Sequence, residues 1–189
     1  MTTIVTILSE GYADWETALL NAGAKQYFGI TTQFATPGGQ VVTSAGGLRV
    51  MPDLAVEDID VSVIDALVVN GGTAWSREDA PDVSAVLVAA RDAGKTVAAI
   101  CDATLALARA GLLDDVAHTS NHSENLTPTG YRGAAHYLDQ PQAVVDGRIV
   151  TAAGTAPVSF MGGVLESLGL RTGDLDYYLG MYGAEHKAG

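Results

Sequence analysis

Cysteine is almost absent from this 189-residue sequence: Cys101 stands alone, so no intrachain disulfide can form. This excludes the small secreted disulfide scaffolds and fits a reducing compartment. Basic residues are also scarce, because 10 Lys and Arg stand against 22 Asp and Glu and the formal net charge is −12. Binding to a nucleic-acid backbone requires clustered basic side chains, and we therefore expect no nucleic-acid partner.

Long apolar runs are missing as well, since none approaches the roughly 18 residues that span a bilayer. Residues 1–10 have neither a basic stretch nor a small-residue cleavage site, so we expect no signal peptide, no membrane partner and a cytoplasmic location. The hydrophobic share of 48% excludes a disordered acidic tail. The length predicts a single domain over residues 1–189, at about 150 residues per domain.

Short β-branched or apolar runs alternate with segments of helical periodicity along the chain. Buried strands are expected at residues 3–8, 31–36, 66–69 and 96–100, and shorter strands at 41–43, 48–50, 118–120, 143–145 and 149–152. Helices are expected at residues 14–28, 80–93, 102–110, 156–168 and 174–185. This alternation predicts an α/β fold, with a doubly wound, mostly parallel sheet between two layers of helices. Sites in such folds lie beyond the carboxyl ends of the strands.

Cys101 lies where the strand at 96–100 meets the helix at 102–110. A potential nucleophile at a sharp strand-to-helix turn is typical of a nucleophile elbow. The amino end of a helix lowers the pKa of a thiol, so we expect the pKa of Cys101 to lie below the free value of about 8.5. The competing interpretation is a small buried core cysteine without chemistry.

Two further features surround this position. Gly71 and Gly72 follow the strand at 66–69, and the backbone amide of Gly72, together with that of Asp102, is a candidate oxyanion hole. Glu16 follows the first strand and is a candidate carboxyl at the same sheet edge. A protonated Glu16 would donate a hydrogen bond to a thiolate, whereas two anions would repel. Each feature also has a plain explanation, as an ordinary turn or as an acidic residue favoured in a first helical turn.

Together, the segment from Gly11 to Glu16, the Gly71-Gly72 turn and the run ending at Cys101 resemble the ThiJ/PfpI superfamily. The resemblance covers nearly the whole chain and includes residues 153–157. This superfamily has a class I glutamine amidotransferase-like fold and includes the Parkinsonism-associated protein deglycase. The resemblance implies a flavodoxin-like sandwich, a homodimer, a strained backbone at Cys101 and a Glu16 carboxyl facing the thiol.

The sequence also departs from the pattern of the superfamily. Asp102 follows the elbow cysteine, where members often have a small residue or the histidine base of the peptidase-like branch, which weakens a peptidase interpretation. The third site residue in the family is frequently a histidine, and its place falls near Asn121, between His118 and His122. Strand alternation puts Asn121 and His122 on opposite faces. Both remain candidates on equal terms, with His118 behind them.

The sequence lacks the residues that glutamine amidotransfer and metal binding would require. Glutamine amidotransfer needs a late His-x-Glu pair, but His186 is followed by Lys187. The four histidines, at positions 118, 122, 136 and 186, form no metal-ligand pattern, so we expect no metal and no cofactor.

The leading hypothesis is a cysteine-dependent enzyme acting on a small electrophilic substrate, by glyoxalase- or deglycase-like rearrangement or by isocyanide-hydratase-like hydration or hydrolysis. Cys101 would attack, Glu16 would orient the thiol and shuttle a proton, and His122 or Asn121 would position substrate or water. The pocket is expected to be walled by Tyr12, Trp15, Trp75 and Tyr131. The alternatives are a redox or stress sensor that oxidises Cys101, and a chaperone or binding module in which Asp102 has abolished activity.

Overall fold

A seven-stranded sheet forms the centre of the protein in the computed structural model, which describes residues 2–170 and 172–184. The strand order is β5-β2-β1-β6-β7-β9-β8, and every neighbouring pair is parallel except β9 and β8. A separate hairpin is formed by β3 and β4. The strands are β1 Thr3–Ile7, β2 Thr31–Thr36, β3 Val42–Thr43, β4 Arg49–Val50, β5 Leu54–Ala55, β6 Ala66–Val69, β7 Thr96–Ile100, β8 Val144–Asp146 and β9 Ile149–Ala152.

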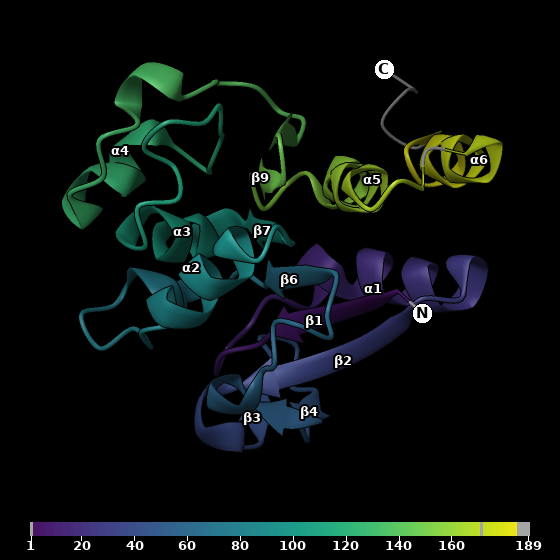
Figure 1. The fold of residues 1–189 in the computed structure, drawn as a ribbon, viewed down its shortest axis with the longest axis horizontal. Coiled ribbons are helices and arrows are strands. Elements are labelled where there is room, and N and C mark those ends of the chain that lie inside the picture. Colours follow the sequence, from purple (N-terminus) through teal and green to yellow (C-terminus); the bar gives the residue numbers. More distant parts are fainter. Residues whose placement is uncertain (1, 171, 185–189) are drawn as a thin grey trace.

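Helices cover both faces of this sheet, as the sequence predicts (Figure 1). Helices α1 and α5 pack together on one face, with α6 against α5, while α2 and α3 lie on the other. The helices are α1 Asp14–Phe28, α2 Ser84–Asp92, α3 Thr104–Arg109, α4 Ser123–Leu126, α5 Pro157–Ser167 and α6 Gly173–Tyr182. The predicted flavodoxin-like, mostly parallel fold is therefore confirmed.

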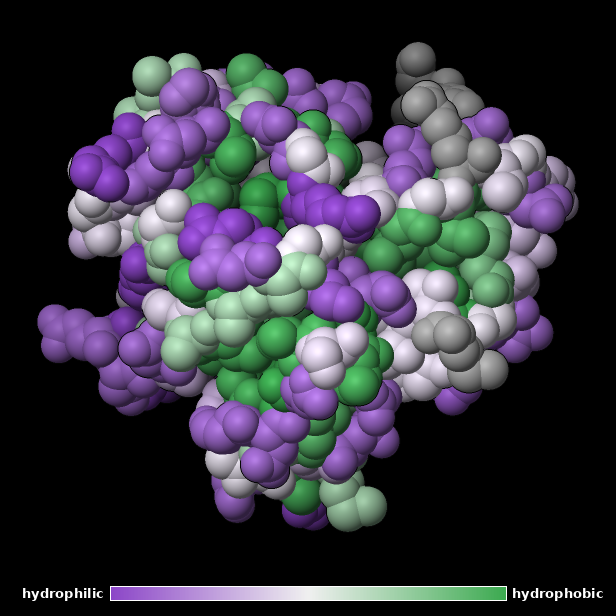
Figure 2. All heavy atoms as spheres, in the orientation of Figure 1, coloured by the Kyte–Doolittle hydropathy of each residue, from purple (hydrophilic) through white to green (hydrophobic). Residues whose placement is uncertain are grey.

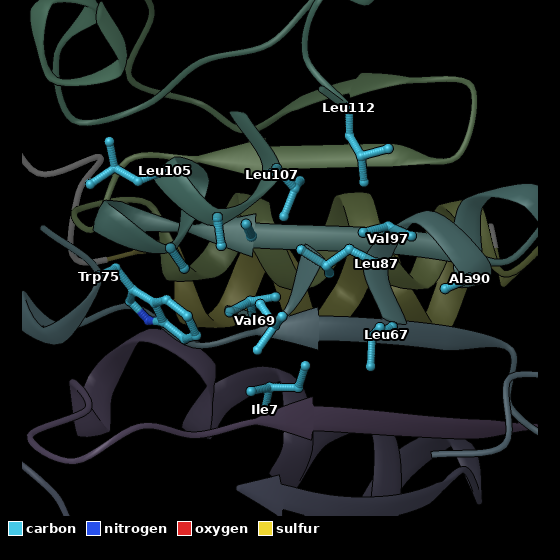
Figure 3. Packing of buried hydrophobic residues seen from close by; sticks show 14 of the residues in the cluster. Ile7, Leu67, Val69, Trp75, Leu87, Ala90, Val97, Leu105, Leu107 and Leu112 are labelled. Atoms are coloured by element: carbon cyan, nitrogen blue, oxygen red, sulfur yellow. The ribbon is translucent and has the colours of Figure 1, made fainter. Parts of the chain in front are cut away.

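The central strands are buried on both faces, and successive side chains enter different cores. Leu67, Val69 and Val97 join the core under α2 and α3, together with Leu87 and Leu107 (Figure 3). Their neighbours Ala66, Val68 and Ala98 join the core under α1 and α5. A strand buried on both sides must be apolar at every position, and this explains the continuous apolar runs in the sequence.

Three predicted elements differ from the structure. Helix α2 begins at Ser84 rather than at residue 80, and just before it Asp82 Oδ1 accepts a hydrogen bond from the Ser84 amide at 2.9 Å. Residues 118–120 make only an isolated bridge to Tyr137 instead of a strand, and the Thr119 amide bonds the Thr151 hydroxyl. The expected last helix ends at Tyr182, and Glu185 and His186 lie outside the described residues. Strand β5 and helix α4 are additional elements.

Hydrophilic side chains cover much of the face in Figure 2, and hydrophobic ones reach the surface between α1 and α5. Among the helices of the described residues, none combines the length and apolar character that crossing a membrane requires.

Candidate active site

Cys101 lies at the turn between β7 and α3, within a 3-10 turn over Cys101–Ala103. Its φ of 61° makes it the one non-glycine residue with positive φ in the described part of the chain. A side chain in this left-handed region costs about 1–2 kcal/mol, and such strain persists only where the surroundings enforce it. Hydrogen bonds of Thr104 hold the backbone of Cys101 in this conformation. Thr104 Oγ1 donates to the Cys101 carbonyl at 2.8 Å and lies 2.7 Å from Ser120 Oγ. This is the elbow that the sequence predicts.

Glu16 projects from the first turn of α1 toward this elbow and is only 1% exposed. Its carboxyl is hydrogen-bonded to the Cys101 thiol and to the Gly71 amide. Its Oε2 atom is buried without a geometrically complete hydrogen bond. In the described residues the ion pairs join Arg77 to Asp79, Arg91 to Asp92 and Arg132 to Asp114, so none of them involves Glu16. A buried carboxyl without a counter-ion favours its protonated form.

The pKa values of this pair follow from burial. Burial is the largest effect on Glu16 and raises its pKa to about 7. The negative charge of Asp102 also raises this pKa, whereas the hydrogen bonds with Cys101 and Gly71 lower it. Burial likewise raises the pKa of Cys101 to about 11, and the nearby Glu16 raises it as well. Hydrogen bonds from Asn121 and from the Asp102 amide lower this pKa, but by less. The prediction of a lowered thiol pKa is therefore wrong, because desolvation outweighs the short helix. Near neutral pH the thiol keeps its proton and Glu16 titrates.

Asn121 occupies the third corner of the site. Its Nδ2 atom lies 3.1 Å from Cys101 Sγ and 2.9 Å from Asp102 Oδ1, and its Oδ1 accepts from the Gly154 amide at 2.9 Å. His122, the equal candidate, is exposed and has no hydrogen bond to Cys101 or Glu16. The difference arises because residues 118–120 are no strand, so alternation is no guide to the direction of the following side chains.

His118 is fully buried away from the thiol. Its Nδ1 lies 2.8 Å from the Val116 carbonyl, and its ring packs edge-on against Tyr131 and Tyr137. Burial lowers its pKa, so the ring is neutral. It is a packed core residue.

Two glycines make room for the pair. A Cβ atom built on Gly154 would lie 2.9 Å from Glu16 Oε1 and 3.0 Å from Cys101 Sγ, and one on Gly71 would lie 2.6 Å from Cys101 Cβ. A Cβ atom on Gly72 would meet the backbone of Gly11 and Tyr12, and the oxyanion-hole role of the Gly72 amide stays a prediction. The Asp102 amide does bond the Cys101 sulfur. Gly154 belongs to the segment 153–157 of the family resemblance, but no site role could be assigned to it from spacing alone.

Of the predicted pocket residues, Trp75 is contradicted by the structure, while the roles of Tyr12 and Trp15 stay predictions. Trp75 is fully buried in the core under α2 and α3, where its Nε1 donates to the Asn70 carbonyl at 2.7 Å (Figure 3). Trp15 is 58% exposed. Tyr12 packs with Leu8 and Val42. A cavity of about 440 Å³ lies beside the elbow and is lined by Asp102, Arg109 and Glu124, while Cys101 is not among its lining residues.

The described residues include no group of three or more His, Cys, Asp or Glu side chains placed to hold a metal ion. The chemistry available to the described side chains at this site is that of one thiol, one buried carboxyl, one amide and one half-buried carboxylate.

A thiol on the elbow of a flavodoxin-like sheet, hydrogen-bonded to a buried carboxyl, defines the class of elbow-cysteine α/β proteins. The chain belongs to the DJ-1/PfpI family, whose model matches residues 2–167. It is similar to the DJ-1 superfamily protein of Agrobacterium tumefaciens, whose crystal structure gives a TM-score of 0.96 at 47% identity and covers 98% of this chain and 100% of that one.

Two curated relatives have names that point to enzymes. The uncharacterized protease YoaZ of Bacillus subtilis is 34% identical over 167 residues, 82% of this chain and 78% of that protein. The glutathione-independent glyoxalase DJR-1.2 of Caenorhabditis elegans is 27% identical over 128 residues, 67% of this chain and 66% of that protein. The names differ in reaction, and the family alone does not identify the chemistry of this chain.

Proposed function

We propose that this protein is a cysteine-dependent enzyme that converts small α-oxoaldehydes, by a glyoxalase-type rearrangement or hydration. The observation that carries the proposal is the hydrogen bond between the strained Cys101 thiol and the buried Glu16 carboxyl. A general base works best when its pKa lies near the working pH, and the pKa of Glu16 is about 7. Glu16 is therefore the group that activates a thiol whose own pKa is too high for spontaneous ionisation.

The first step is the addition of the sulfur to the aldehyde carbon. The Sγ–C bond forms, the C=O π bond breaks, and Glu16 takes the thiol proton and delivers it to the carbonyl oxygen. The second step moves the hydrogen of the former aldehyde carbon to the neighbouring ketone carbon and the hydroxyl proton to the ketone oxygen. A thioester and an alcohol form, so that the first carbon is oxidised and the second reduced. Water then cleaves the thioester and restores the thiol. The overall change is the addition of one water to the oxoaldehyde, and no external oxidant or reductant is required.

A peptidase reaction is disfavoured by the same geometry. Peptide hydrolysis needs an acid that protonates a leaving amine, which is usually an imidazole beside the nucleophile. Among the described residues no histidine contacts Cys101: His118 is packed elsewhere, and His122 and His136 are exposed. An amide, Asn121, lies in that place and cannot transfer a proton.

The test is methylglyoxal turnover, followed as lactate formation, by the wild type, Cys101→Ser and Glu16→Gln. Lactate formation that is lost in both variants supports the proposal. Turnover retained by Cys101→Ser would exclude the mechanism for this substrate.

A redox sensor is the second candidate, and one observation favours it. Glu16 Oε2 is buried beside the sulfur without a complete hydrogen bond, so a protonated Glu16 could donate to an oxygen added to that sulfur. Dilute peroxide followed by intact-mass measurement distinguishes the two functions. A selective gain of two oxygens at Cys101, without turnover of aldehydes, favours sensing.

A further inference from the structure

Asp102 is the carboxylate nearest to the nucleophile after Glu16, and its place is held by Asn121. The Asn121 Nδ2 atom lies 2.9 Å from Asp102 Oδ1 and 3.1 Å from Cys101 Sγ. Because one nitrogen contacts both atoms, they are separated by no more than about 6 Å, a distance at which charges in a partly buried site interact strongly. The carboxylate therefore acts directly on whatever approaches the sulfur.

Within the described part of the chain, the Asp102 carboxylate forms no ion pair. The ion pairs among the described residues do not include Asp102, Glu16 or Glu124. Arg109 borders the same cavity and keeps its positive charge there, because the group to which its Nη1 donates at 2.8 Å is the neutral Trp75 carbonyl. The lining of this cavity thus has two carboxylates, Asp102 and Glu124, against the single guanidinium of Arg109. The formal charge of this lining is therefore −1, with the same sign as the net charge of −12 of the whole chain.

We propose that Asp102 is a specificity-determining residue that admits neutral and cationic electrophiles to Cys101 and rejects anionic ones. The inference builds on the proposed function, because it names the charge class of the substrate. It favours neutral oxoaldehydes, or those that carry an amine, over α-oxo acids and phosphorylated aldehydes. Asp102 excludes the wrong substrates by repulsion, as specific sites commonly do.

The test uses two alkylating reagents of nearly equal size, neutral iodoacetamide and anionic iodoacetate. In each reaction a Cys101 Sγ–C bond forms, the C–I bond breaks, iodide leaves and the thiol proton passes to solvent. Because the chain has a single cysteine, every labelled molecule reports on this site. The measured quantity is the ratio of the two rate constants, divided by the same ratio for N-acetylcysteine. A change in the pKa of the thiol alters both rates alike and cancels in the ratio.

We expect the normalised ratio of the folded wild type to favour iodoacetamide by about tenfold or more. Asp102→Asn keeps an oxygen that accepts from Asn121 but removes the charge, and we expect it to lower the preference severalfold. A cationic reagent, 2-bromoethylamine, should show the opposite change. Asp139→Asn is the matched control, because Asp139 is exposed and its loss changes the net charge equally.

Three outcomes would overturn the inference: a wild-type ratio equal to that of N-acetylcysteine, an Asp102→Asn ratio equal to that of the wild type, or equal effects of Asp102→Asn and Asp139→Asn. Failure of all reagents to label Cys101 would also overturn it, because a filter acts only on a site that electrophiles reach. None of these measurements needs turnover. A protein that shows the charge preference but makes no lactate would refute the proposed reaction alone.

Discussion

Asn121 faces Cys101 with the donor end of its amide, 3.1 Å from the sulfur. The acceptor end is occupied by the Gly154 amide at 2.9 Å, and the donor end is shared with Asp102. Because both ends have partners of fixed type, the amide cannot turn over without losing bonds. In the proposed reaction, a neutral donor would therefore stabilise the negative charge on the sulfur, and all proton transfer would be left to Glu16.

Replacement of Asn121 by alanine should lower kcat/KM for the oxoaldehyde by about 10- to 100-fold. A hydrogen bond to a group that becomes charged contributes about 1.5–3 kcal/mol, and this donor would be lost as the thiol ionises. Steady-state kinetics measures the effect. His122→Ala is the control, because His122 is the exposed neighbour of Asn121 and should leave the rate unchanged. Equal losses in the two variants would contradict the assignment.

The rate of turnover should rise with pH through about 7. Glu16 accepts the thiol proton only as a carboxylate, and burial raises the pKa of this group to about 7. The ionised fraction therefore grows as the pH increases across that value. A profile of kcat/KM between pH 5.5 and 9 should show this rise as an ascending limb in the wild type. Glu16→Gln should lower the rate by about 10²- to 10⁴-fold and abolish the limb. Activity that falls with rising pH would show that the protonated carboxyl is the active form.

The same carboxyl should make the protein less stable at alkaline pH. The folded-state pKa of Glu16 is raised from 4.5 to about 7, so the folded state binds this proton more tightly than the unfolded state. Between these values the unfolded state holds fewer protons, and stability falls as the pH rises. Above pH 7 the cost is about 3 kcal/mol.

Glu16→Gln removes this titration and should stabilise the protein at pH 8. The gain should shrink as the pH falls toward 4.5, where the folded state of the wild type is protonated and the unfolded state is about half protonated. Urea denaturation at pH 8 and at pH 4.5 measures the difference between the two variants. A Gln variant less stable than the wild type at both values would show that Glu16 is held by favourable interactions instead.

The segment from β7 to α3 shows which features of the site can be predicted from the sequence. The apolar run at 96–100 predicts a buried strand, and Cys101 at its end predicts the elbow, because both depend on local pattern. The identity of the third site residue depends on long-range packing. Asn121 is brought to Cys101 by bonds that cross 20 and 33 residues, to the elbow and to Gly154. No periodicity in a loop carries that information, which is why His122 is an equal candidate from sequence alone.

The pocket and the pKa of the thiol also exceed what sequence can provide. Trp75 and Trp15 lie beside the expected site in sequence, but one is enclosed in the core and the other is 58% exposed. The thiol pKa depends on the balance between a short helical turn and burial. That balance is decided by neighbours such as Glu16 and Gly154, which lie far from Cys101 along the chain.

A single methyl group at Gly154 should separate the active pair. The added Cβ would lie 2.9 Å from Glu16 Oε1 and 3.0 Å from Cys101 Sγ, closer than ordinary contacts allow, so one of these groups must move. A displaced carboxyl no longer reaches the thiol proton, and we expect Gly154→Ala to lose at least tenfold in kcat/KM. Gly180→Ala in α6 is the matched control, because nothing lies within 4 Å of its added Cβ.

The two alanine variants also separate a local effect from unfolding. Gly180→Ala replaces a helical glycine and should raise stability by up to about 1 kcal/mol without changing the rate. Gly154→Ala should keep a cooperative unfolding transition while its methylglyoxal turnover and its Glu16-dependent pH limb are lost. A fully active Gly154→Ala protein would mean that the contact between Glu16 and Cys101 tolerates displacement, and the general-base role of Glu16 would then be wrong.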